Sequence, residues 1–315
     1  MFPQQERFSP LSQLAILFGL CCAGILIGSF ATLLAADLYL KAPLTNLAQE
    51  LMKGENANLS RLLQFLSTFF FMALPAVFFS VITQRKPFQY LGFNMAPSGK
   101  QTFLIVGIVF TALFVSGSLG ELNQLIPLSK GLTKYFQSLE DEYSKEVIAL
   151  INLKSSADYI IALIIIAFLP ALFEEMFFRG CLQQLMIILF RNTIAGIIVT
   201  SLFFSAIHLS FYGFLPRLFL GIMLGYIFYY SKNLWLNIAA HFLNNAFAVT
   251  QMYALSRAGK LNTESMDENF PLYYGLVAIV AFYFIFVIFK RESEFVISMH
   301  NMRKYADEKN EEETF

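Results

Sequence analysis

The stretch Leu172-Phe173-Glu174-Glu175-Met176-Phe177-Phe178-Arg179-Gly180 places three ionisable side chains in the middle of a long apolar run. Apolar residues dominate on both sides of it, through 160–173 and 185–190. Near the centre of a membrane-spanning helix, each ionised side chain costs about 2.5–3.5 kcal/mol on insertion scales. A chain that keeps two carboxylates and an arginine there needs partners for them, and those partners must come from other segments.

The composition is that of a polytopic membrane protein. Of 315 residues, 57% are hydrophobic and 14% are charged, whereas about 25% are charged in a typical soluble domain. The formal net charge is zero, so nothing indicates a nucleic-acid partner. The cysteines form no CxxC pair and predict neither a disulfide framework nor a zinc knuckle; they are Cys21, Cys22 and Cys181.

Apolar runs long enough to cross a bilayer as helices predict an all-α fold, a polytopic membrane bundle of about eight transmembrane helices. The first run exceeds the roughly 7–15-residue core of a signal peptide, so we expect it to be retained. Residues 1–290 are expected to form one membrane-embedded domain with its motif core in 156–254, and 291–315 a polar tail. The expected spans are 12–36, 61–83, 102–120, 156–180 or 156–190, 193–211, 214–231, 233–254 and 271–290.

The longest polar segment, about 121–155, has apolar residues near helical spacing. It predicts an amphipathic helix lying at the membrane surface, with a gate for substrate as the alternative. Ser155 and Asp158 resemble a capping box that opens the fourth span.

Basic residues in the short loops predict the orientation of the chain. In an eight-span bundle these loops share one side, and the positive-inside rule then makes both termini cytoplasmic. We expect a multi-pass protein of the cell membrane, in a bacterium the inner membrane. The basic residues are Arg85, Lys86, Lys100, Arg191 and Lys232, with Lys290 and Arg291 at the end of the last span.

Helical spacing separates the two carboxylates of the opening stretch. Glu175 and Arg179 are one turn apart, share a face and are expected to pair. Glu174 points about 100° away from Glu175 and lacks a local partner. The chain has three histidines, of which His208 and His241 lie within apolar spans.

Depth in the membrane allows Glu174 and these histidines to meet. At 1.5 Å per residue, Glu174 stands about 25 Å from the loop at Arg191 and His208 about 24 Å from it. The estimate assumes that the fourth helix is unbroken; a break at Gly180 or a bend at Pro170 would move Glu174 toward the membrane face.

A carboxylate beside an imidazole can hold and deprotonate a water molecule. A second imidazole and a side-chain amide, here those of His241 and Asn245, can donate hydrogen bonds to the oxyanion of an attacked carbonyl. Together they are suited to hydrolysis of a peptide bond without a covalent intermediate. The chain has no Gly-x-Ser-x-Gly elbow and no Walker-type loop, and Cys181 has no histidine at helical spacing.

These residues resemble the CPBP family of CAAX-type prenyl-protein endopeptidases and bacteriocin-processing or immunity proteins, also called the Abi family. Its pattern is Glu-Glu-x-x-x-Arg, then Phe-x-x-x-His, then His-x-x-x-Asn or Asp, on separate membrane helices. Each motif alone is weak, but the three in this order on three apolar spans are specific. They read Glu174-Glu175-Met176-Phe177-Phe178-Arg179, Phe204-Ser205-Ala206-Ile207-His208 and His241-Phe242-Leu243-Asn244-Asn245.

The resemblance implies an intramembrane glutamic endopeptidase, a hydrolase. Glu174 would activate water with the help of His208, while His241 and Asn245 would stabilise the oxyanion. The implied supporting residues are Glu175, Arg179, Phe204 and Asn244.

The expected partners are the lipid bilayer and a peptide or protein substrate, which in eukaryotic relatives is a prenylated Cys-a-a-X tail. We expect no cofactor. Zinc is a weaker alternative, because two histidines and a glutamate could bind it but the His-Glu-x-x-His helix is missing.

Other functional classes remain open beside the protease. A non-catalytic membrane scaffold or a bacteriocin-immunity protein of the same family could keep these residues for binding or stability. A transporter is disfavoured because the spans offer few polar groups beyond this cluster.

Overall fold

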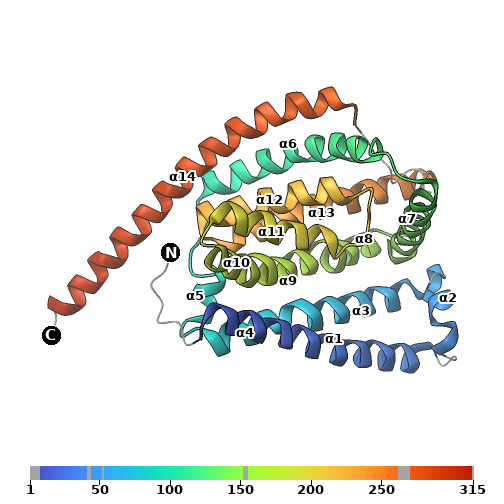
Figure 1. Cartoon of the computed structure of the whole chain (residues 1–315), viewed down its shortest axis with the longest axis horizontal. Coiled ribbons are helices and arrows are strands. Elements are labelled where there is room, and N and C mark those ends of the chain that lie inside the picture. Colours follow the sequence, from blue (N-terminus) through green and yellow to red (C-terminus); the bar gives the residue numbers. More distant parts are fainter. Residues whose placement is uncertain (1–7, 41–43, 52, 152–154, 262–269, 314–315) are drawn as a thin grey trace.

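The computed structural model describes residues 8–40, 44–51, 53–151, 155–261 and 270–313, and within these ranges the chain is helical and contains no strand. The helices labelled in Figure 1 are α1 (Pro10–Leu40), α2 (Leu47–Leu51), α3 (Ala57–Thr68), α4 (Leu74–Thr83), α5 (Pro87–Leu91), α6 (Gly99–Gln124), α7 (Lys130–Ile151), α8 (Ser156–Ala162), α9 (Leu169–Phe177), α10 (Gln183–Phe190), α11 (Thr193–Ala206), α12 (Phe214–Ser231), α13 (Leu234–Arg257) and α14 (Leu272–Glu313). Short 3₁₀ turns, Leu44–Asn46 and Gly54–Asn56, flank α2.

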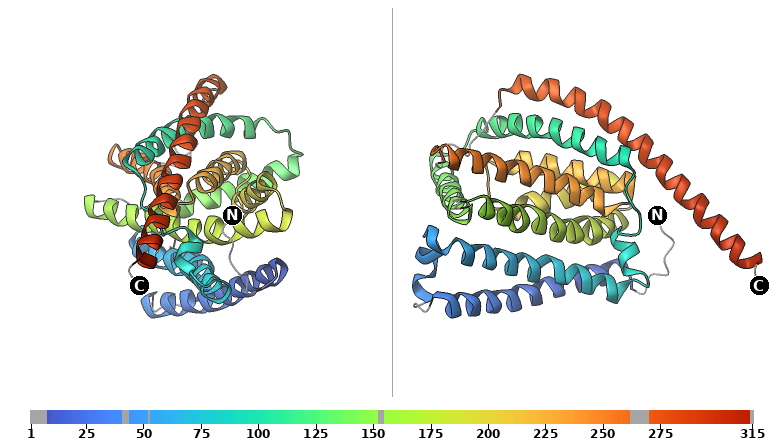
Figure 2. Two further views of the ribbon diagram at one scale, coloured as in Figure 1. Left: turned by 90° about the vertical axis from the view of Figure 1, so that its left-hand side faces the viewer. Right: turned by 180° about the vertical axis from the view of Figure 1, so that it is seen from behind.

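The long helices run roughly side by side in layers (Figures 1 and 2). The pair formed by α1 and α3–α4 packs against α9, α9 packs against α13, and α12 joins α11 and α13 to α6 and α14. Six of the described helices are long and apolar enough to cross a membrane, and α11 is a shorter apolar helix. The six long helices, α11 and α13, which has a polar inward face, correspond to the eight expected spans. The described residues therefore confirm an all-α membrane bundle.

The fourth span is one continuous helix over Ser156–Phe190. It contains two π-helical segments, Leu163–Phe168 and Phe178–Leu182. The first lies immediately before α9, in which Pro170 is the second residue. Proline lacks the N–H that an α-helix needs at this point, and a wider π-turn lets the chain pass it without a break. The second contains Arg179 and Gly180, so the helix does not end at Gly180.

The fifth expected span is shorter than predicted, because α11 ends at Ala206 rather than at residue 211. His208 therefore lies just beyond the helix, in the segment 207–213 that leads to α12. Asn123 of α6 fixes this segment: its Nδ2 donates to the Phe211 carbonyl at 2.8 Å, and its Oδ1 accepts from the Leu215 N–H at 3.0 Å.

The predicted amphipathic helix is present as α7 and lies across one end of the bundle (Figure 1). It contacts the segment 207–213, where the rings of Phe136 and Phe211 stack at 4.6 Å and Ser210 donates to Glu140 at 2.8 Å. The capping box of Ser155 and Asp158 opens α8 as expected.

The start of α1 and the end of α14 lie at the other end of the bundle, together with the loops that carry the basic residues (Figure 1). At this end Lys100 pairs with Glu292 of α14 at 2.8 Å. The backbone of α14 continues without interruption from the last span into the expected polar tail. Both described ends thus share one side, as predicted, while the assignment of that side to the cytoplasm stays a prediction.

Candidate active site

The carboxylate of Glu175 is fully buried and both of its oxygens accept hydrogen bonds. Arg179 donates from Nη1 to Oε1 at 2.7 Å, and this buried ion pair is the predicted pairing one helical turn apart. His241 donates from Nδ1 to Oε1 at 2.8 Å, and Asn237 donates from Nδ2 to Oε2 at 3.2 Å. Arg179 also donates from Nη2 to the Gly221 carbonyl at 3.1 Å. Glu175 thus links α9, α13 and, through Arg179, α12.

Phe204 packs in the centre of this group. The guanidinium carbon of Arg179 lies 4.9 Å from the centre of its ring, a cation–π contact. The rings of His208 and His241 lie edge-on to it at 5.1 and 5.8 Å. Phe204 therefore holds both imidazoles beside the buried ion pair.

Glu174 lies on the other side of His241. Its Oε2 is buried, has no hydrogen-bond partner among the described residues, and lies 3.8 Å from His241 Nε2. Glu174 is also within electrostatic range of His208. His241 therefore stands between the two neighbouring glutamates, bonded to one and facing the other.

The hydrogen bonds of the two histidines fix where their protons are. His208 Nδ1 lies 2.7 Å from the Phe204 carbonyl, and His241 Nδ1 lies 2.8 Å from the Glu175 carboxylate. Both partners can only accept, so each Nδ1 carries a proton. In the neutral imidazoles, each Nε2 then carries a lone pair that can take a proton. His241 can donate from Nε2 only when its ring carries both protons.

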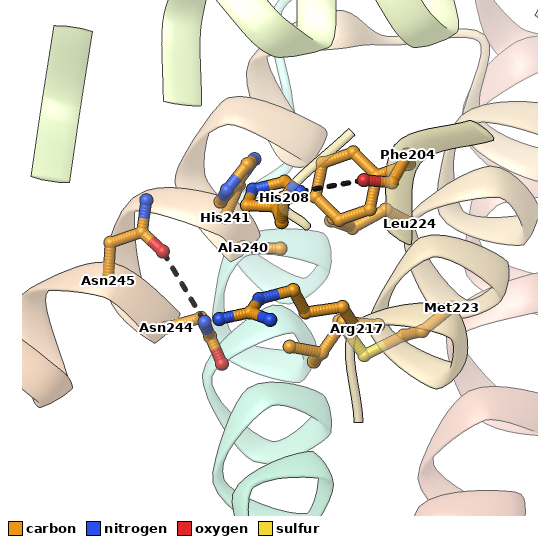
Figure 3. Close-up of a pocket in the computed structure, with 10 residues that line it drawn as sticks. Phe204, His208, Arg217, Met223, Leu224, Ala240, His241, Asn244 and Asn245 are labelled. Carbon is orange, nitrogen blue, oxygen red and sulfur yellow. Dashed lines mark hydrogen bonds between the residues drawn. The ribbon is translucent and has the colours of Figure 1, made fainter. Parts of the chain in front are cut away.

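A cavity of about 90 Å³ adjoins both histidines (Figure 3). This is room for a few water molecules. Asn244 donates to Oδ1 of Asn245 at 3.4 Å, and the Asn245 amide nitrogen has no hydrogen bond to another described residue. The lining residues are Phe204, His208, Arg217, Leu220, Met223, Leu224, Ala240, His241, Asn244 and Asn245. Glu174 does not line the cavity, but its Oε2 lies 3.8 Å from Nε2 of His241, which does.

All eight residues singled out in the sequence are thus brought into one region, from three segments of the chain. They are Glu174, Glu175, Arg179, Phe204, His208, His241, Asn244 and Asn245.

Two residues of this region, Asn237 and Arg217, were not predicted from the sequence. Asn237 stands one turn before His241 and continues the polar face that includes Asn245. Arg217 is a charged residue at the start of an otherwise apolar helix. Either pattern could have identified them.

The described residues contain no group of three or more His, Cys, Asp or Glu side chains that could hold a metal ion. The histidine nitrogens that have assigned partners bond to Phe204 and Glu175.

Residues 156–247 match the family model described as "Rce1-like: Type II CAAX prenyl endopeptidase Rce1-like". Neither the comparison with curated proteins nor that with solved structures found a match. The matched range runs from α8 into α13 and contains the three motifs. Residues 156–247 of this membrane protein are therefore similar to the Rce1-like type II CAAX prenyl endopeptidase family, a match consistent with the CPBP family.

Proposed function

We propose that this protein is an intramembrane endopeptidase that hydrolyses a peptide bond of a membrane-associated protein or peptide, with Glu174 as the general base. One observation carries the proposal above the others. Of two adjacent glutamates, Glu175 is fully buried with both oxygens bonded, whereas the buried Oε2 of the partly buried Glu174 has no described partner and faces His241. A carboxylate left free beside an imidazole that lines a water-sized cavity has the arrangement of a general base.

In the proposed reaction, Glu174 takes a proton from a water molecule while the lone pair on His208 Nε2 helps to orient it. The water oxygen attacks the carbonyl carbon of the scissile bond and forms a tetrahedral oxyanion. The carbonyl–nitrogen bond then breaks as the proton held by Glu174 passes to the leaving amine. The products are a carboxylic acid and an amine, with no covalent enzyme intermediate.

Asn245 and His241 are the proposed donors to the oxyanion. The free amide nitrogen of Asn245 donates without any change of protonation. His241 joins it when its ring carries both protons. Donors fixed before the reaction stabilise developing charge without reorganisation, and loss of one such donor typically lowers kcat by about 10²–10³-fold.

Glu175 and Arg179 act as positioning residues. Their ion pair holds His241 through Nδ1 and ties α9 to the Gly221 carbonyl of α12. The proposed chemistry therefore needs both glutamates, in different roles.

The substrate class that follows from the Rce1-like match is a lipid-modified Cys-a-a-X tail, and other membrane peptides are to be tested beside it. We propose that the reaction requires no metal ion, and that the protein lies in the cell membrane with both termini in the cytoplasm.

The decisive experiment compares peptides from membranes and culture medium of cells that express wild type, Glu174→Gln or Glu294→Gln. Glu294 is exposed on α14, lies near Lys290 of the same helix and serves as the control. We expect fragments that depend on wild type and Glu294→Gln but vanish in Glu174→Gln.

The same variants, purified and supplied with the peptides so identified, test the chemistry directly. Cleavage should persist in the presence of a metal chelator. Full cleavage by Glu174→Gln would contradict the proposed base. A cellular phenotype that survives in Glu174→Gln without any cleaved peptide would favour the scaffold or immunity function.

A further inference from the structure

Arg217 lines the same cavity as the two histidines, and no acidic side chain among the described residues neutralises its positive charge. Its side chain forms no ion pair with a carboxylate among the described residues, and its Nη1 is buried without a hydrogen-bond partner. Arg179 differs in having the carboxylate of Glu175 at 2.7 Å.

The position of Arg217 is set by shape rather than by an opposite charge. A Cβ atom at Gly213 would collide with its Nη1, so the glycine leaves the space that the guanidinium fills. The guanidinium carbon lies 5.5 Å from the centre of the Tyr143 ring of α7, a cation–π contact. Glu140 of the same helix accepts from Ser210 and forms no ion pair with Arg217. In Figure 3 the guanidinium points along the cavity toward Asn244.

A guanidinium held in this way is suited to a carboxylate. It stays charged at all physiological pH values, and its planar N–H groups match the two oxygens of a carboxylate. The cavity of about 90 Å³ is smaller than a typical ligand pocket of roughly 300–1,000 Å³, so it holds one chemical group rather than a chain segment. A carboxylate bound there would belong to a part of the substrate close to the scissile bond.

We propose that Arg217 binds a carboxylate of the substrate within a few residues of the scissile bond, and that it thereby determines specificity. The inference rests on the proposed peptidase function and deepens it. The carboxylate has two sources, the free C-terminus of a substrate that ends shortly after the cleaved bond, or an Asp or Glu side chain near that bond.

The test uses peptide libraries with randomised residues, prepared once with a free C-terminal carboxylate and once with a C-terminal amide. Purified full-length protein in lipid nanodiscs is incubated with each library, and the cleaved peptides are identified by mass spectrometry. The variants are wild type, Arg217→Gln, Arg217→Lys, Gly213→Ala and Glu174→Gln, with Arg85→Gln as the control. Arg85 is exposed in the loop after α4, at the opposite end of the bundle.

If the terminal carboxylate is bound, wild type and Arg85→Gln should cleave the acid library about 10–100-fold more efficiently than the amide library. Arg217→Gln should lower this ratio to near one, mainly by raising KM for the acid peptides. Arg217→Lys should retain part of the preference, and Gly213→Ala should reduce it by displacing the guanidinium. If a side chain supplies the carboxylate, the cleaved amide peptides should be enriched in Asp or Glu near the cut, and Arg217→Gln should remove the enrichment.

Two results would overturn the inference while leaving the peptidase function intact. One is wild-type cleavage with no preference for a carboxylate in either form. The other is an equal loss of kcat by Arg217→Gln on all peptides, which would indicate an oxyanion donor or a structural role. Absence of cleavage of either library by wild type would contradict the proposed function itself.

Discussion

Glu174 and Glu175 are neighbours in the chain but belong to two different environments. On the Glu175 side, an ion pair and three further hydrogen bonds connect α9 with α12 and α13. On the Glu174 side, an unpartnered carboxylate oxygen adjoins His241, and the nearby cavity holds an arginine without an ion pair among the described residues. One helical step of about 100° separates the two environments.

The difference indicates which buried charges serve the fold and which are available for chemistry. A buried charge is costly unless it is paired and hydrogen-bonded. Glu175 meets that condition within the protein, so its removal should affect stability first. Glu174 does not, so its removal should affect activity first. The predictions below test this division, from the largest expected effect to the smallest.

Replacement of Glu174 by Gln should lower the rate of peptide hydrolysis by about 10²–10⁴-fold, the usual contribution of a general base. The thermal stability of the purified protein should stay the same or rise, because a partly buried carboxylate is removed whose Oε2 has no hydrogen-bond partner among the described residues. Turnover of an identified substrate and thermal unfolding in the same detergent would measure both. A strongly destabilised variant would show that Glu174 also stabilises the fold, and this would contradict the division of roles between the two glutamates.

Replacement of Glu175 by Gln should destabilise the protein by about 3–5 kcal/mol, because Arg179 is left as a buried charge without its partner. The double variant Glu175→Gln, Arg179→Met should recover part of that stability, because neither charge remains. Thermal unfolding of the single and double variants measures the effect. A single variant as stable as wild type would show that the ion pair does not support the fold.

Replacement of Asn237 by Ala should destabilise the protein by about 1–3 kcal/mol, because Oε2 of Glu175 loses its donor while remaining buried. Activity should fall less than in the Glu174 variant, since His241 keeps its bond to Oε1. The control is Asn192→Ala, which removes a helix cap in an exposed loop. A larger loss of activity than in Glu174→Gln would contradict the division of roles.

Lys232 is a partly buried cation that lies outside both environments, in the turn between α12 and α13. Burial lowers the pKa of Lys232 from 10.5 to about 8, and its ammonium lies 4.3 Å from the centre of the Tyr229 ring. Because the unfolded chain binds more protons between about pH 8 and 10.5, stability should rise with pH across that window. Lys232→Met should remove the rise and stabilise the protein by about 1–2 kcal/mol at pH 7, after allowance for partial exposure.

Unfolding of wild type and Lys232→Met from pH 7 to 10.5 measures this effect. The same pH slope in both proteins would show that Lys232 is not its source.

The sequence alone determined the features that depend on the local geometry of a helix. The apolar runs located the spans, and the spacing of Glu175 and Arg179 predicted their ion pair. The same pitch predicted that Glu174 points away from that pair. These predictions succeed because the 3.6-residue turn is fixed by the backbone and does not depend on neighbouring helices.

Only the tertiary structure decided how the helices meet. It placed His241 between the two glutamates, brought Asn237 to Glu175 and Arg217 into the cavity, and ended α11 at Ala206. That helix end depends on contacts from Asn123 and α7, which are distant in sequence. Distances between helices depend on the packing of side chains from many segments, whereas the faces of each helix depend on its own sequence.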